Sequence, residues 1–352
     1  MRHKSIFRVI IFTALLALTG AQCISFGGGA TASTAGGVFK SQNNGAQWVQ
    51  KATLFTSAGI KSFGGVNITS LSIDPEDHLA LYAATRENGM FYSYDGGESW
   101  NLSNYIAKGD VGSIAVDPKN KCVIYAALDN QVMKSSDCNR TFARAYNEAT
   151  PQTFVTAVAV SPFNSSVVFA GTSRGTFLKS VDGGASWSIR GNAVGIVHDI
   201  ILDSRNSSVV YVSVTGRGIW KSINGGDAFQ DMSVSLRSAN ANDVRRIVLD
   251  RATPDAILLA SKQKLLRSTD GGATWAVLPT ISREGVDITA LAVNPKNSKE
   301  VYYGTASTFY RSIDGGQNWS TQRLPSTRQA SALIVDPENP ATIYMGMLEI
   351  KK

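Results

Sequence analysis

Residues 180–187 read SVDGGASW and residues 268–275 read STDGGATW. The pattern is a serine, an aspartate or asparagine two positions later, then small or polar residues and a closing aromatic residue. Successive copies begin 42 to 52 residues apart, and the spacing predicts a fold built from one repeated unit. The seven copies are SQNNGAQW from Ser41, SYDGGESW from Ser93, SSDCNRTF from Ser135, SVDGGASW from Ser180, SINGGDAF from Ser222, STDGGATW from Ser268 and SIDGGQNW from Ser312.

A second motif precedes every copy but the first. It is an apolar segment, a turn that often contains Asp-Pro and a second apolar segment, as in residues 68–85 and 155–172. A further such pair lies at 331–347 with no serine motif after it. Each unit therefore contains two strands, a third strand such as GTFLKS, and a hairpin turn into a fourth strand.

Four antiparallel strands repeated every 40 to 50 residues indicate an all-β, seven-bladed β-propeller. The first motif, within residues 37–49, supplies only the outer two strands of a blade, and residues 331–347 supply only the inner two. We expect these termini to pair into one shared blade, which closes the ring and removes exposed sheet edges.

The repeated motif resembles the Asp-box, or BNR repeat, of sialidases, xyloglucanase-type glycoside hydrolases, sortilin-type receptor ectodomains and photosystem II assembly-factor propellers. We expect its acidic or amide side chains to accept backbone N–H groups inside the turn, and its tryptophans to pack the turn on the blade. Metal binding or acid catalysis by these positions is the alternative. The polar residues are Asp95, Asp137, Asp182, Asn224, Asp270 and Asp314, and the tryptophans are Trp48, Trp100, Trp187, Trp275 and Trp319.

The N-terminus has the composition of an export signal. Arg2, Lys4 and Arg8 precede a short apolar stretch, so residues 1–22 are predicted to be a signal peptide. LTGAQC, ending at Cys23, resembles a bacterial lipoprotein signal, which implies lipidation of Cys23 and placement on the outer face of a membrane; cleavage after Ala21 to a secreted protein is the alternative. Residues 23–36 are predicted to form a flexible tether, and residues 37–350 are predicted to form the propeller.

The third motif lacks both glycines and carries Cys138 in place of the first. Cys122 opens the second strand of the same blade, so the two cysteines are expected near each other. An oxidising compartment would allow a disulfide across this turn, and two free thiols are the alternative.

Charge is predicted to separate by face. The chain carries a formal +7, which falls to +4 when the three basic residues of the signal are removed. The Asp-Pro turns and the serine motifs hold an acidic excess, whereas the opposite face holds a basic excess. Arginine is suited to carboxylate, sulfate and phosphate groups, so the basic face predicts an anionic ligand. Candidate ligand-binding residues there are Arg86, Arg174, Arg217, His198, Asp199, Arg245 and Arg246.

Four of these candidates stand out because most other inner strands carry small residues at the aligned positions. Large polar groups in a crowded inner ring need a local reason. The two reasons are a salt-bridged network that fills the channel, and a site for an anionic ligand. These four are His198, Asp199, Arg245 and Arg246.

The leading interpretation is a monomeric, non-catalytic extracytoplasmic binding or assembly scaffold that recognises an acidic protein segment or an anionic glycan. Its long connections, residues 49–67 and 230–243, are expected on the binding face. No cofactor or metal is predicted, because no motif for them occurs. Nucleic-acid binding is disfavoured by the predicted export and by the modest mature charge.

The alternative is a glycoside hydrolase, sialidase-like or xyloglucanase-like, which needs two carboxylates flanking one bond. The chain lacks the RIP motif of sialidases and has room for one propeller, whereas xyloglucanase-type enzymes use two. Carboxylates on the basic face are Asp110, Asp199, Asp243, Glu284 and Asp287.

Overall fold

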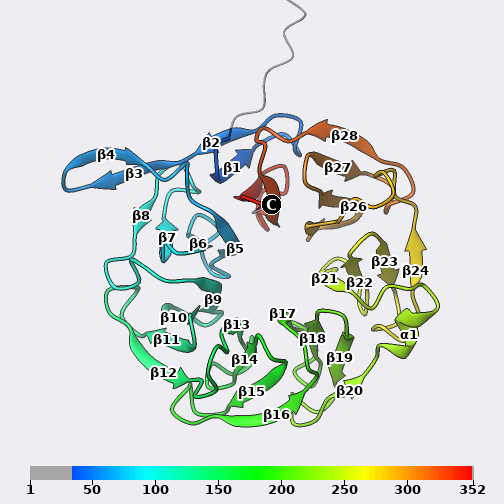
Figure 1. The fold of residues 1–352 in the computed structure, drawn as a ribbon, viewed down its shortest axis with the longest axis horizontal. Coiled ribbons are helices and arrows are strands. Elements are labelled where there is room, and N and C mark those ends of the chain that lie inside the picture. Colours follow the sequence, from blue (N-terminus) through cyan, green and yellow to red (C-terminus); the bar gives the residue numbers. More distant parts are fainter. Residues whose placement is uncertain (1–33, 351–352) are drawn as a thin grey trace, which may run out of the picture. The chain divides into compact units, whose positions relative to one another are not determined.

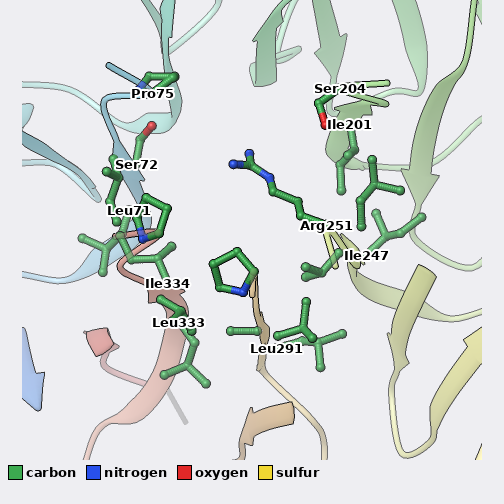
Figure 2. A pocket seen from close by; sticks show the side chains of 18 of the residues that line it. Leu71, Ser72, Pro75, Ile201, Ser204, Ile247, Arg251, Leu291, Leu333 and Ile334 are labelled. Carbon is green, nitrogen blue, oxygen red and sulfur yellow. The ribbon is translucent and has the colours of Figure 1, made fainter. Parts of the chain in front are cut away.

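A computed structural model of the chain describes residues 34–350, and within them seven four-stranded antiparallel sheets surround a central channel (Figure 1). The predicted signal peptide and Cys23 lie outside the described residues. The predicted seven-bladed β-propeller is confirmed. One end of the channel is shown from close by in Figure 2.

We number the blades in chain order, each from its innermost strand outward. Blade 1 contains β5 (Ile68–Ile73), β6 (Leu81–Thr85), β7 (Met90–Ser93) and β8 (Asn101–Leu102). Blade 2 contains β9 (Val111–Asp117), β10 (Asn120–Leu128), β11 (Gln131–Ser135) and β12 (Ala143–Asn147). Blade 3 contains β13 (Val155–Val160), β14 (Val168–Thr172), β15 (Thr176–Ser180) and β16 (Ser188–Asn192). Blade 4 contains β17 (Val197–Leu202), β18 (Val210–Val214), β19 (Gly218–Ser222) and β20 (Gln230–Asp231).

The remaining blades follow the same order. Blade 5 contains β21 (Val244–Leu249), β22 (Ile257–Ser261), β23 (Leu265–Ser268) and β24 (Ala276–Leu278). Blade 6 contains β25 (Ala290–Asn294), β26 (Asn297–Gly304), β27 (Thr308–Ser312) and β28 (Ser320–Arg323). Blade 7 contains β29 (Gln329–Val335), β30 (Ile343–Leu348), β1 (Gly37–Ser41) and β2 (Val49–Lys51).

Blade 7 closes the ring with strands from both ends of the described chain. β1 runs antiparallel to β30, with Gly37 opposite Met347 and Ser41 opposite Ile343. The sheet order β2-β1-β30-β29 is the one that the incomplete first and last repeats predict. Ring closure therefore depends on pairing between segments about 300 residues apart.

Two elements lie in the long connections and were not predicted. Hairpin β3 (Thr53–Thr56) and β4 (Gly59–Ser62) stands outside the ring beside blade 1 (Figure 1). Backbone hydrogen bonds join Thr53 and Phe55 to Trp100, so this segment extends the outer edge of blade 1. A single helical turn, α1 (Val234–Arg237), follows β20.

The core lies between the flat faces of neighbouring blades. One cluster joins Val38 and Tyr344 of blade 7 to Leu71 and Trp100 of blade 1. Trp100 is completely buried and packs edge-on against Phe63 at 5.5 Å between ring centroids. Because each blade is covered on both faces, its middle strands are mainly apolar, in keeping with the low charged fraction of 17%.

Each serine motif forms a hydrogen-bonded turn between the third and fourth strands. In the fourth copy the Ser180 hydroxyl donates to Asp182 Oδ1 at 2.8 Å and accepts the N–H of Gly184 at 2.8 Å. Asp182 Oδ1 also accepts the N–H of Ser186 at 2.8 Å. Asn224 makes the same contacts in the fifth copy, so the bonds need only an oxygen acceptor and not a charge. These contacts support the structural interpretation of the motif.

The turn of one blade is fastened to the preceding blade by two donors. Lys134 Nζ and Tyr125 Oη both donate to the carbonyl of Gly183, at 2.8 and 2.9 Å. Gly183 has φ +70°, which suits glycine and presents its carbonyl to the neighbouring blade. Two other interfaces repeat the arrangement, with Lys40 and Tyr344 on Gly96 and with Lys221 and Tyr211 on Gly271.

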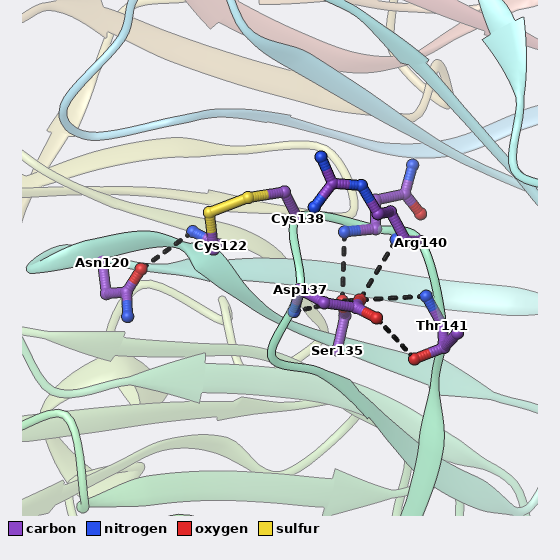
Figure 3. Close-up of a disulfide and its surroundings, with 8 residues drawn as sticks. Asn120, Cys122, Ser135, Asp137, Cys138, Arg140 and Thr141 are labelled. Carbon is purple, nitrogen blue, oxygen red and sulfur yellow. Dashed lines mark hydrogen bonds between the residues drawn. A yellow bond between two sulfur atoms is a disulfide. The ribbon is translucent and has the colours of Figure 1, made fainter.

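The third motif is closed by a disulfide. Cys122 and Cys138 are bonded, and the bond ties the start of β10 to the turn after β11 (Figure 3). Cys138 and Asn139 occupy the two glycine positions and keep the left-handed backbone, with φ +60° and +65°. Asp137 still accepts the N–H of Thr141 at 2.9 Å. A covalent link therefore accompanies the backbone conformation that glycine provides elsewhere.

The motif aspartates give a first prediction, on acid stability. Hydrogen bonds, chiefly from Ser186 and Thr274, hold the pKa values of Asp182 and Asp270 at about 2. A carboxyl in an unfolded chain titrates near 3.9, so these groups add stability that is complete above about pH 4 and lost as the pH falls towards 2. D182N/D270N is expected to flatten the dependence of unfolding free energy on pH between 4 and 2, measured by urea denaturation.

The control is D182A/D270A, which removes the acceptor as well as the charge. It should lose more stability at pH 7 than the asparagine variant, which keeps the Oδ1 acceptor and loses only what the charge contributes. Equal losses in the two variants at pH 7 would contradict the role given to the oxygen acceptor.

Candidate functional site

A cavity of about 510 Å³ occupies the end of the channel at which the inner strands begin. Small side chains form much of its wall, and they come from five blades. Blades 4 and 5 break this pattern with His198, Arg245 and Arg246, and Arg86 joins them from the turn after β6. The small residues are Thr69, Gly112, Thr156, Thr289 and Ser331.

Four of the seven sequence-predicted residues thus line one cavity: Arg86, His198, Arg245 and Arg246. Alternation along a strand explains the arrangement, because the first residues of the inner strands take equivalent places around the channel. Small residues at those places leave room, and the large polar groups of two adjacent blades enter it.

The three guanidinium groups differ in their partners. Arg246 lies 3.6 Å from Asp199 and donates to the carbonyl of Ser331 at 2.9 Å. Arg245 lies 3.3 Å from Asp243. The side chain of Arg86 has no hydrogen-bond or ion-pair partner among residues 34–350, so its charge is available to a ligand.

Asp199 links the inner strands of two neighbouring blades. Its Oδ2 accepts the N–H of Ile247 in the next blade at 3.2 Å. Ser113 makes the equivalent link two blades earlier, where its hydroxyl accepts the N–H of Val158 at 2.8 Å. Burial raises the pKa of Asp199, while Arg246 opposes that shift. Asp199 therefore belongs to the salt-bridged network that links neighbouring inner strands.

His198 is held neutral. Burial, and then the charges of Arg246 and Arg245, lower the pKa of His198 to about 3. Its Nε2 is buried and has no hydrogen-bond partner among the described residues. A neutral imidazole beside two arginines can donate to or accept from a bound group without adding charge at physiological pH.

Arg174 and Arg217 lie outside this cavity. Arg174 donates to the carbonyl of Pro151 and Arg217 to that of Val194, each at 3.2 Å. These bonds tie the β14–β15 and β18–β19 turns to the connections that enter blades 3 and 4, and neither arginine lines the cavity. The long connections 49–67 and 230–243 contribute nothing to its wall.

Sequence reasoning did not assign a ligand-binding role to several other residues that line the cavity, among them Asp287, Gln329 and Leu348. Asp287 precedes β25, and the other two lie on the shared blade 7. Asp287 was considered only as a carboxylate for hydrolysis. Alignment of the repeats could have placed Gln329 at the start of an inner strand, whereas Leu348 enters only because β30 runs back to the same end.

The carboxylates on this face do not gather into a matched pair. Asp199 and Asp243 each face an arginine, and Asp110 accepts the N–H of Glu87 at 2.7 Å. Glu284 is exposed, and Asp287 alone of the five lines the cavity. Residues 34–350 hold no group of three or more His, Cys, Asp or Glu side chains placed to bind a metal ion. Nor does any helix in that range have the length and apolarity needed to cross a membrane.

Fold and turn chemistry together define the chain as a seven-bladed β-propeller of the Asp-box type. The family model described as BNR/Asp-box repeat matches residues 91–102, which include the second serine motif.

Two curated relatives extend the comparison. The chain is 24% identical to xyloglucanase Xgh74A of Acetivibrio thermocellus, an alignment that includes 68% of this chain and 28% of the relative. It is 25% identical to a xyloglucanase of Hypocrea jecorina, over 76% of this chain and 43% of the relative. The chain thus spans less than half the length of each of these proteins.

Solved structures share the fold at lower identity. A GH74 xyloglucanase from Xanthomonas campestris superposes with a TM-score of 0.65 at 18% identity, over 81% of this chain and 51% of that one. YCF48 from Cyanidioschyzon merolae gives a TM-score of 0.61 at 14% identity, over 80% of this chain and 96% of that one. YCF48 has also been solved bound to a D1 peptide, and that structure gives a TM-score of 0.61 over 94% of its chain.

Proposed function

We propose that this propeller is a non-catalytic extracytoplasmic binding or assembly scaffold that holds an anionic partner, an acidic protein segment, at the cavity lined by Arg86, Arg245 and Arg246. The observation that carries the proposal is the meeting of three guanidinium groups and a neutral histidine at one open cavity. Asp287 is the one carboxylate that lines it. Arginine binds carboxylates in a planar, two-pronged geometry, which a peptide rich in Asp or Glu would supply.

Two further facts support a peptide partner. YCF48, which has the same fold and nearly the same length as the aligned part of this chain, is described in complex with a peptide. The cavity lies at one end of the channel and is lined largely by residues of the inner strands, and pre-organised interfaces move little on binding. An anionic glycan would satisfy the same arginines, and the experiment below separates the two.

The test is calorimetric titration with an oligoglutamate peptide and, separately, with a heparin oligosaccharide. R86Q/R245Q should weaken peptide binding by about tenfold or more, because each lost charge-assisted hydrogen bond is worth about 1.5 kcal/mol or more. R174Q/R217Q removes the same charge from the same face outside the cavity and should leave affinity within about twofold. Raised salt should weaken binding.

If both double variants lose peptide affinity equally, the site does not lie in the cavity, and the binding reflects only the general positive charge of this face. Binding of heparin without binding of the peptide would assign the cavity to glycans. Absence of both interactions would remove the proposal.

The second candidate is glycoside hydrolysis, which the xyloglucanase relatives favour. Glycosidases place two carboxyl groups about 5 to 10 Å apart across the bond they cut. Asp287 lines the cavity, whereas Asp199 is occupied by Arg246 and by the backbone of Ile247. Incubation with xyloglucan should release no reducing ends above the level of heat-treated protein. Release that D287N abolishes would reverse the order of the two candidates.

A further inference from the structure

The opposite end of the channel holds a second cavity of about 450 Å³, within the size range of small-molecule sites (Figure 2). It is lined by the last residues of five inner strands and by the turns that follow them. The wall is mainly aliphatic, and prolines from three turns form its rim. Among the residues that form it are Leu71, Ile201, Ile247, Leu291, Leu333 and Val335.

One guanidinium stands in this apolar surrounding. Arg251 follows β21 and extends into the cavity from the side of blade 5 (Figure 2). Its side chain has no hydrogen-bond acceptor and no carboxylate partner within residues 34–350. Arg251 lines the cavity and is itself exposed, so a ligand can reach its guanidinium.

The carboxylates near Arg251 are bound elsewhere. Asp250, its neighbour in sequence, accepts a hydrogen bond from the guanidinium of Arg267 at 2.6 Å and another from the Ser298 hydroxyl at 2.8 Å. Asp74, which lines the cavity, is buried and accepts the N–H of Glu76 at 2.9 Å. Arg251 is therefore the one basic side chain that lines the cavity, and it has no ion-pair partner among residues 34–350.

We propose that this end of the channel binds an amphipathic anion of the long-chain carboxylate type, with its carboxylate on Arg251 and its alkyl chain along the aliphatic wall. Charge complementarity selects the head group, because a guanidinium in an apolar site gains most from a carboxylate. The aliphatic wall favours an alkyl tail, because covering this apolar surface with a polar anion would give no hydrophobic stabilisation. The site does not depend on the proposed anionic partner, which binds at the other end of the channel.

The experiment is titration of the full chain with octanoate, decanoate and dodecanoate below their micelle-forming concentrations. Affinity should rise about fourfold for each added methylene, the factor expected for burying one CH₂ group. R251Q should weaken dodecanoate binding by about tenfold or more, and R251K should retain part of it. Dodecanol, which has the same tail without the charge, should bind the parent and R251Q equally.

The matched control is K299Q. Lys299 is exposed on β26 and does not line the cavity, so its replacement changes the net charge equally and should leave dodecanoate affinity unchanged. The proposal is overturned if dodecanoate does not bind, if R251Q binds it as tightly as the parent, or if chain length has no effect. A peptide with an apolar C-terminus that binds where dodecanoate fails would assign the cavity to peptides and also overturn it. Oligoglutamate binding by R251Q, measured alongside, should stay as in the parent and so distinguishes this failure from a failure of the proposed function.

Discussion

Removal of residues 329–350 is expected to leave the chain unfolded, not as a smaller ring. These residues are β29 and β30, the inner half of blade 7. Without them β1 and β2 remain as an isolated two-stranded ribbon, which is marginal in water. The deletion also removes buried Tyr344 from the cluster shared with blade 1, and Leu333 and Met345 from the cluster shared with blade 6.

The size of the effect follows from burial. Each large apolar side chain that is buried contributes about 1.5 to 3 kcal/mol, and β29 and β30 together bury at least five of them. The loss is comparable to the whole stability of an ordinary domain, about 5 to 15 kcal/mol. Circular dichroism during heating should show no cooperative transition for the truncated chain.

A circular permutant is the matched control. Its new termini lie at Ser57 and Ala58, in the exposed turn of the β3–β4 hairpin, and a short loop joins the end of β30 to the start of β1. Because Met347 already faces Gly37, that loop needs only a hairpin turn. The permutant should melt cooperatively near the parent. A truncated chain that melts as the parent does would contradict closure by blade 7.

Loss of the disulfide is the second large effect. C122A/C138A should lower the free energy of unfolding by about 3 kcal/mol, the amount expected when a loop of this length is no longer closed in the unfolded chain. Urea denaturation of the parent with and without reductant should show the same difference.

A rescue variant tests the link between the disulfide and the backbone. C122A/C138G puts glycine at the position with φ +60°, where a residue with a side chain costs about 1 kcal/mol or more. It should recover about that much relative to C122A/C138A. Asn139 is kept, because its side chain accepts the hydroxyl of Ser103 in the neighbouring blade. Identical midpoints in the presence and absence of reductant would show that the bond does not stabilise the turn.

The repeated sequence predicted the fold because its period and its turn residues agree at every unit. The serine motif forms a hairpin turn at Ser180 as it does at Ser268. The incomplete first and last repeats can complete a blade only by pairing with each other, and this pairing closes the ring. The β3–β4 hairpin was missed because it occurs once, and repetition carries no information about a single insertion. The lysine and tyrosine pair that holds Gly183 was missed for another reason: the partners belong to different repeats and meet only in space.

The site was predicted in part for the same reasons. Departures from the repeat at His198, Arg245 and Arg246 marked the cavity, because aligned inner strands bring aligned residues to one end of the channel. Arg174 and Arg217 share that face, yet they fold back onto carbonyls of their own surroundings, which the sequence does not encode in a readable pattern. Arg251 was not selected, because its importance comes from the lack of a partner.

Photo-crosslinking tests the proposed binding site most directly. An oligoglutamate peptide that carries a photoactivatable group would be irradiated with the full chain, and the products mapped by mass spectrometry. The account predicts crosslinks at the cavity of Arg86, Arg245 and Arg246, and their loss in R86Q/R245Q. Crosslinks concentrated on the serine-motif turns at the opposite face, or unchanged in that variant, would contradict it.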